Sequence, residues 1–106
     1  MTLLSRTEEM YMVAIWELGD QAYGVAIRQH VSEKTGKMIS YGGLYIALDQ
    51  LHKKGFVDKV SGEPLAKRGG RTRFFYSLTD SGVEALKATY AHQQALWAGV
   101  SGMTSD

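Results

Sequence analysis

The side chains most suited to binding another molecule are cationic and lie in one run, Lys67-Arg68-Gly69-Gly70-Arg71-Thr72-Arg73. Four long cations around two glycines are able to follow a phosphate backbone or to enter a minor groove. The stretch from Lys37 to Tyr76 holds eight basic and three acidic residues, whereas the rest of the chain has more acidic than basic residues. This asymmetry predicts a surface that meets a polyanion, although a solvated charged face would give the same pattern.

Patterns typical of enzymes and metal sites are missing from the sequence. His30, His52 and His92 stand far apart, without the spacing of a histidine metal site, and the chain has no cysteine. It has neither a Gly-x-Ser-x-Gly nucleophile motif nor a Gly-x-x-x-x-Gly-Lys phosphate loop. We therefore expect a protein that is not an enzyme and that binds neither a metal ion nor a cofactor.

Length and hydropathy indicate the broad class. A chain of 106 residues, 44% hydrophobic and 22% charged, supports one globular domain with a modest core. It contains no apolar run of the roughly 18 residues that a membrane span needs, and its first residues do not resemble a secretory signal. These features predict a cytoplasmic protein that makes no contact with a membrane.

Capping residues and hydrophobic periodicity predict four helices and a β-ribbon. The expected elements are a helix from the capping box of Ser5 and Glu8 to Gly19, a helix over 22–35 capped by Asp20, a helix over 41–54, strands over 56–61 and 72–78, and a helix over 80–98 capped by Thr79. This is the order of a winged helix-turn-helix, a DNA-binding unit whose ribbon is the wing. We therefore expect a mainly α fold with a small β-ribbon.

The third predicted helix has two distinct faces. Its apolar residues recur at helical spacing, from Leu44 to Leu51, and are expected in the core. The other face starts with Gly42 and Gly43, which would let the backbone approach the floor of a DNA groove, although a frayed helix start would also explain them. The residues predicted to contact DNA, from this helix, the preceding turn and the wing, are Lys37, Ser40, Tyr41, Gly42, Gly43, Tyr45, Ile46, Lys53, Lys67, Arg68, Arg71 and Arg73. Asp49 lies on the same face, where phosphate would repel it unless it accepts from a cytosine amino group.

The first predicted helix is apolar around most of its circumference, and a 106-residue monomer offers little material to bury it. The last helix has a seam at alternating gaps of three and four residues, as in a short coiled coil. We expect a homodimer whose interface comprises Met10, Val13, Trp16, Val83, Leu86, Tyr90, Gln93 and Trp97. The chain then divides into a DNA-binding unit (1–79, with the wing at about 56–78), a dimerisation helix (80–98) and a flexible tail (99–106).

An ordered set of short motifs resembles the PadR family of transcriptional regulators. The motifs are Tyr23-Gly24, then Gly43-Leu44-Tyr45 followed by Leu48, Leu51 and Gly55, then Gly69-Gly70-Arg71, and finally Tyr76-Ser77-Leu78-Thr79 ahead of Gly82. Each is weak alone, but their order is specific, and the resemblance covers roughly Leu4 to Trp97. The single C-terminal helix resembles the short form of the family.

The resemblance implies a homodimeric repressor that binds double-stranded DNA at a palindromic operator. The third helix would lie in the major groove, the wing against the backbone, and the C-terminal helix on the partner's first helix. Tyr45 would touch the DNA backbone, although it could equally be half-buried packing. Family members often respond to small aromatic compounds, and Met12, Trp16 and Trp97 would line such an effector pocket, although side chains of these types are more commonly core or interface packing.

The sequence departs from the family at the start of the third helix. Many family members have a Ser-Pro-Gly-Thr-like start to the recognition helix, whereas this chain has Ser40-Tyr41-Gly42-Gly43, so the operator sequence cannot be inferred. A winged-helix module that binds RNA or a protein partner, and a MarR-type regulator, remain as alternatives. The positive charge of helix and wing argues against a purely protein-binding module, and a MarR-type protein usually has more helix around the motif.

Overall fold

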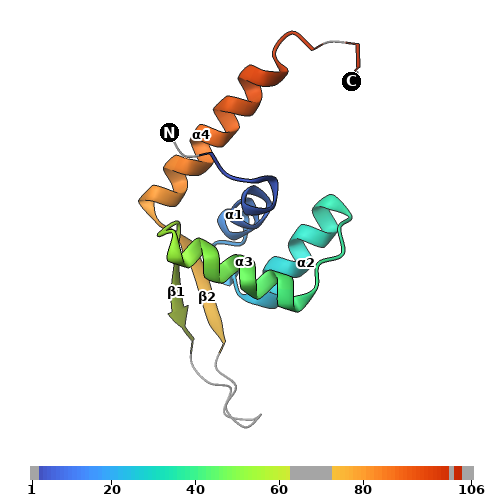
Figure 1. Ribbon diagram of the computed structural model, residues 1–106. Coiled ribbons are helices and arrows are strands. Elements are labelled where there is room, and N and C mark those ends of the chain that lie inside the picture. Colours follow the sequence, from blue (N-terminus) through green and yellow to red (C-terminus); the bar gives the residue numbers. More distant parts are fainter. Residues whose placement is uncertain (1–2, 63–72, 101, 104–106) are drawn as a thin grey trace.

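A computed structural model describes residues 3–62, 73–100 and 102–103. The elements follow the order α1 (Arg6–Leu18), η1 (Gly19–Gln21), α2 (Gly24–Thr35), α3 (Tyr41–Lys53), β1 (Val57–Ser61), β2 (Phe74–Leu78) and α4 (Asp80–Trp97). Figure 1 shows α3 and the two-stranded wing on one side of the molecule, with the far end of α4 standing clear of the other helices. This mainly helical fold with a small antiparallel sheet confirms the predicted fold class.

Two of the four helices begin at the caps that the sequence predicts, Ser5 and Thr79, and α3 begins at a cap formed by Ser40. The Ser5 hydroxyl accepts from the Glu8 amide at 3.1 Å, and the Glu8 carboxylate accepts from the Ser5 amide at 2.8 Å, which completes the capping box of α1. Ser40 and Thr79 accept from the amides of Gly43 and Gly82, each at 3.0 Å. These bonds satisfy amides that have no partner within the first helical turn.

The start of α2 was predicted wrongly. Asp20 lies in η1 rather than at a helix cap, and α2 begins at Gly24 after an extended Tyr23 that makes no side-chain capping bond. The reason is long-range pairing: the Tyr76 amide donates to the Ala22 carbonyl at 2.8 Å, and Tyr23 forms an isolated bridge with Phe75. Residues 22 and 23 therefore run beside β2, with Tyr23 in an extended conformation.

The wing is an antiparallel pair of strands. Each strand starts later than predicted, β1 at Val57 rather than residue 56 and β2 at Phe74 rather than residue 72. Val57 pairs with Leu78 and Ser61 with Phe74. Val57 and Tyr76 point into the core, with 1% and 3% of their surfaces exposed. The core therefore extends beneath the base of the wing and fixes the sheet against α3.

The core lies between α1, α2, α3 and the sheet. Its largest fully buried side chains are Met12, Ile15, Ile27, Leu44, Leu48, Leu51 and Val57. The first half of α4 closes this core, because Ala85 and Thr89 are buried and the Thr89 hydroxyl accepts from the Leu4 amide at 2.9 Å. The second half of α4 projects beyond it, and Tyr90, Leu96 and Trp97 are exposed there.

Candidate nucleic-acid interface

The outward face of α3 is open at its N-terminal end. Tyr41 and Ile46 are 47% and 62% exposed, and Gly42 and Gly43 lie between them on the surface. A methyl group built on Gly42 would meet no atom within 4 Å, whereas one on Gly43 would come 3.2 Å from the Ser40 hydroxyl. Gly42 and Gly43 therefore lie within a helix that Ser40 caps.

Tyr45 is both packed and exposed. It is 44% exposed, yet its ring lies against the first residue of α2, so that a Cβ on Gly24 would stand 2.4 Å from the Tyr45 hydroxyl oxygen. The ring thus bridges α3 and α2, and its open side remains free to contact another molecule. Gly24 and Tyr45 belong to separate sequence motifs, and no local spacing predicts their contact.

The turn that precedes α3 is held by side chains of α2. The Ser32 hydroxyl donates to the Lys37 carbonyl at 2.8 Å, and the Lys37 amide donates to the Thr35 hydroxyl at 3.3 Å. Lys37, predicted to contact DNA, is exposed at this turn, and Lys53 is exposed at the other end of α3. The two predicted cations therefore lie at opposite ends of the helix.

Cations and aromatic rings are paired along the wing. The guanidinium carbon of Arg73 lies 4.1 Å from the Tyr23 ring centroid, and Tyr23 packs edge-on against Phe75 with centroids 5.7 Å apart. Lys59 lies 4.4 Å over the ring of Phe74. Among the predicted DNA contacts of the wing, Arg73 is within the described structure, whereas Lys67, Arg68 and Arg71 lie outside the described residues.

The structure gives Asp49 a partner. The Asp49 carboxylate lies 3.9 Å from the ammonium of Lys59 on β1. This ion pair joins α3 to the wing and offsets the negative charge of Asp49 on this face. No sequence signal pointed to Lys59, because the pair is formed by residues ten positions apart on different elements.

Tyr76 lies beneath this surface and stays neutral. Burial, with smaller contributions from the charges of Asp49 and Tyr45, raises the pKa of Tyr76 to about 12. The phenol therefore remains protonated at every physiological pH. It adds no negative charge to the face formed by α3 and the wing.

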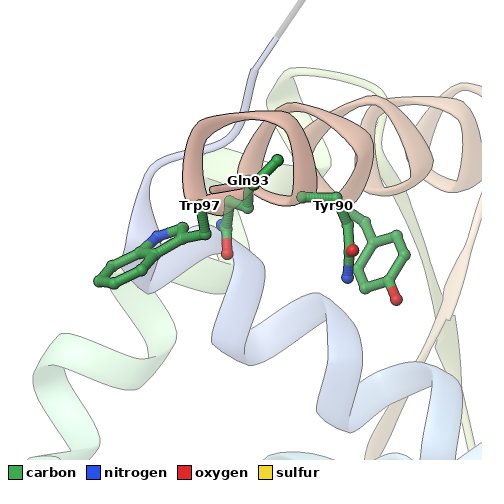
Figure 2. Close-up of a pocket in the computed structure, with 5 residues that line it drawn as sticks. Tyr90, Gln93 and Trp97 are labelled. Atoms are coloured by element: carbon green, nitrogen blue, oxygen red, sulfur yellow. The ribbon is translucent and has the colours of Figure 1, made fainter. Parts of the chain in front are cut away.

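The residues predicted for the dimer interface fall into two groups. Tyr90, Gln93 and Trp97 project from one side of α4 and, together with Gln94 and Ala98, line a shallow hollow of about 350 Å³ (Figure 2). Gln93 also bonds within its own chain, accepting from Arg6 at 3.0 Å and donating to Glu9 at 2.8 Å. The other predicted interface residues are partly buried or exposed on the monomer: Met10, Val13, Val83 and Leu86 are half-buried and Trp16 is 66% exposed.

The predicted effector pocket needs a correction. Met12 is completely buried in the core, where its methyl group would come 3.3 Å from a Cβ placed on Gly82, so it cannot line a ligand site on the surface. Met12 faces the core because α1 turns Tyr11, Met12 and Ile15 inward and Trp16 outward. Trp97 lines the hollow on α4, and Trp16 does not.

Within residues 3–62, 73–100 and 102–103, no three histidine, aspartate or glutamate side chains gather as a metal site would require. No helix in the same ranges combines the length and the apolar character that crossing a membrane requires.

Comparison with known proteins identifies the class. The family model described as the transcriptional regulator PadR-like family matches residues 13–88. The chain belongs to this family, which confirms the predicted resemblance. It is a family of transcription regulators rather than of enzymes. Among the curated proteins compared, none matches this sequence.

Solved structures agree with this assignment. The hsRosR-S1 complex is 28% identical, with a TM-score of 0.70 over 91% of this chain and 78% of that chain. A PadR family regulator from Eggerthella lenta is 24% identical, with a TM-score of 0.70 over 92% and 83%. A transcriptional regulator from Clostridium thermocellum is 22% identical, with a TM-score of 0.72 over 92% of both chains. At these identities the last two show a common fold.

Proposed function

We propose that this protein is a homodimeric transcriptional repressor that binds a palindromic operator. The observation that carries the proposal is the N-terminal turn of α3, which is capped by Ser40, exposed, and open at Gly42. A helix end of this shape lets its backbone approach base edges closely, and Tyr41 and Ile46 flank it with groups suited to phosphate and to a thymine methyl. We assign the major groove to α3 and the DNA backbone to the wing.

The charge of the same face supports duplex DNA as the target. Lys37 and Lys53 lie at the two ends of α3, and Arg73 directly precedes β2 of the wing. A protein that places cations on both flanks of a recognition helix gains affinity from counterion release along the duplex. Because such a regulator works on the chromosome, we place it in the cytoplasm.

Homodimerisation is supported by the exposed apolar side chains of α4 and α1. Tyr90, Leu96 and Trp97 stand on the projecting half of α4, and Trp16 is exposed on α1. Large aromatic side chains grouped in this way are typical of protein interfaces. A two-fold dimer would present two α3 helices to successive major grooves, which accounts for a palindromic operator.

A small aromatic effector would fit the hollow between Tyr90 and Trp97, because both side chains offer a ring face for stacking. Titrating the protein with planar aromatic compounds while recording Trp97 fluorescence, in a Trp16→Phe background, would detect such a ligand. Quenching that saturates supports the effector, and quenching that a Tyr90→Ala change leaves intact would move the ligand elsewhere.

The decisive experiment is selection from a random duplex DNA library at near-physiological salt. An enriched inverted repeat with half-sites about one helical turn apart is expected. Reporter expression from a promoter containing that repeat should fall when the protein is present. Enrichment of a single unrepeated site would contradict the dimeric operator, retention of RNA alone would favour the RNA-binding alternative, and no retention would favour a protein-binding module.

A further inference from the structure

Arg28 lies in the middle of α2, but its side chain reaches across to the start of α3. Its Nε donates to the Ile39 carbonyl at 2.5 Å, and its guanidinium carbon lies 4.3 Å from the ring centroid of Tyr41. Ile39 precedes the N-cap of α3 and Tyr41 is the first residue of the helix. The half-buried Arg28 side chain therefore contacts the residue before and the residue after the Ser40 cap.

The turn between α2 and α3 is fastened in two separate places. Ser32 and Thr35 hold its first half through the backbone of Lys37, directly after the left-handed Gly36. Within the described part of the chain, the side chain of α2 that bonds to the second half is Arg28. The orientation of the first turn of α3 therefore depends on this arginine.

Tyr41 has few other constraints. It is exposed, and its neighbours Gly42 and Gly43 carry no side chain against which its ring could pack. A tyrosine without such contacts would sample several rotamers and lose that freedom on binding. The stacked guanidinium, well within the distance of a cation–π contact, selects one orientation beforehand.

We propose that Arg28 is a positioning residue of the recognition helix, which orders the turn and holds the Tyr41 ring in its DNA-binding orientation without itself binding phosphate. This inference rests on the proposed DNA-binding function. The role needs an arginine, because a planar guanidinium stacks on a ring and donates from its edge at the same time, whereas the ammonium of lysine offers no flat face.

The test is a double-mutant cycle on the selected operator, with affinities measured across a salt series. Arg28→Ala should weaken binding roughly fivefold, the size expected of one cation–π contact. The slope of log affinity against log salt should not change, and Arg28→Lys should fail to restore affinity. Arg28→Ala should have a smaller effect in a Tyr41→Ala background, where only the bond to the Ile39 carbonyl remains to be lost. Lys87→Ala, which removes the same charge from the exposed face of α4, is the matched control and should bind normally.

Three results would overturn the inference. Additive effects of the two alanine changes would show that Arg28 acts independently of Tyr41. A salt slope reduced by about one unit would make Arg28 a phosphate ligand, and full rescue by lysine would show that charge alone is needed.

Hydrogen exchange of the free protein separates this inference from the proposed function. In Arg28→Lys, which keeps the charge and most of the side-chain volume, the amides of residues 39–43 should exchange faster than in the wild type, while those of α1 should not change. Unaltered exchange at 39–43 would overturn the positioning role even if the wild type binds its operator. Wild-type protein that binds no duplex DNA would overturn the proposed function, and the DNA-directed part of this inference with it.

Discussion

Gly24 and Tyr45 are in direct contact: a methyl group on Gly24 would stand 2.4 Å from the hydroxyl oxygen and 2.9 Å from the ring carbon that bears it. Gly24 has no side chain, and the Tyr45 ring occupies the space that a side chain at the start of α2 would need. This contact sets α2 against α3 and leaves one side of the ring exposed towards the proposed DNA. Two motifs of the family resemblance are in this way a single packing feature.

Gly24→Ala should therefore displace Tyr45 and lower the free energy of unfolding by about 1–3 kcal/mol, as overpacking does. Urea unfolding of the variant measures this loss. The same change in a Tyr45→Ala background should cost much less, because the ring that clashes is gone. Equal losses in the two backgrounds would show that the Gly24–Tyr45 contact is not the cause.

Gly82→Ala should be more damaging. A Cβ on Gly82 would lie 2.1 Å from the Phe56 carbonyl oxygen, which is backbone and cannot rotate away as a side chain can. We expect a loss of roughly 3 kcal/mol or failure to fold, since α4 must move off the core. Gly42→Ala is the matched control, because Gly42 also lies within a helix but a Cβ there would meet no atom within 4 Å. This change should raise the free energy of unfolding by up to about 1 kcal/mol and weaken DNA binding. A stable Gly82→Ala protein would contradict the described packing of α4.

Replacing both Arg68 and Arg71 by alanine should weaken binding to operator and random duplex alike. If both side chains contact phosphates, the slope of log affinity against log salt should become shallower by about two units. Fluorescence anisotropy over a salt series measures both quantities. An unchanged slope would remove these wing residues from the interface with DNA.

Trp97→Ala should shift the protein towards monomers. The change deletes a large, 45% exposed aromatic side chain from the proposed α4 interface, where such residues dominate binding energy. Sedimentation velocity over a concentration series reports the shift. A variant that stays dimeric at all concentrations would show that the main interface lies elsewhere.

Acid should weaken the link between α1 and α3. Burial alone would raise the pKa of Glu8, but its bonds to Lys54 and to Ser5 hold the pKa of that carboxyl below its ordinary value. The stabilisation is therefore present above the unfolded pKa and is lost as pH falls through the folded pKa. In Glu8→Gln, stability should fall less as the pH is lowered, which thermal unfolding over a pH series measures. Glu84→Gln, on the exposed face of α4, is the control and should show the wild-type dependence on pH. An unchanged profile would show that the Glu8–Lys54 pair contributes no pH dependence.

The sequence by itself determined the elements whose causes are local. Ser5 and Thr79 cap their helices as predicted, because a cap needs residues three positions apart. The apolar stripe of α3 is buried as its periodicity predicts, with Leu44 and Leu51 in the core. Helix order, the ribbon and the family resemblance follow from signals of the same short range.

Tertiary structure decided what depends on neighbours distant in sequence. Pairing with the wing moved the start of α2 from the predicted Asp20 cap to Gly24. Burial beneath α4 placed Met12 in the core, although its hydrophobicity alone fitted a ligand pocket equally well. The pairs of Asp49 with Lys59 and of Arg28 with Tyr41 join different elements, so no local spacing predicts them. Helical periodicity and capping act within a few residues of the chain, whereas burial and charge pairing depend on how the completed elements pack together.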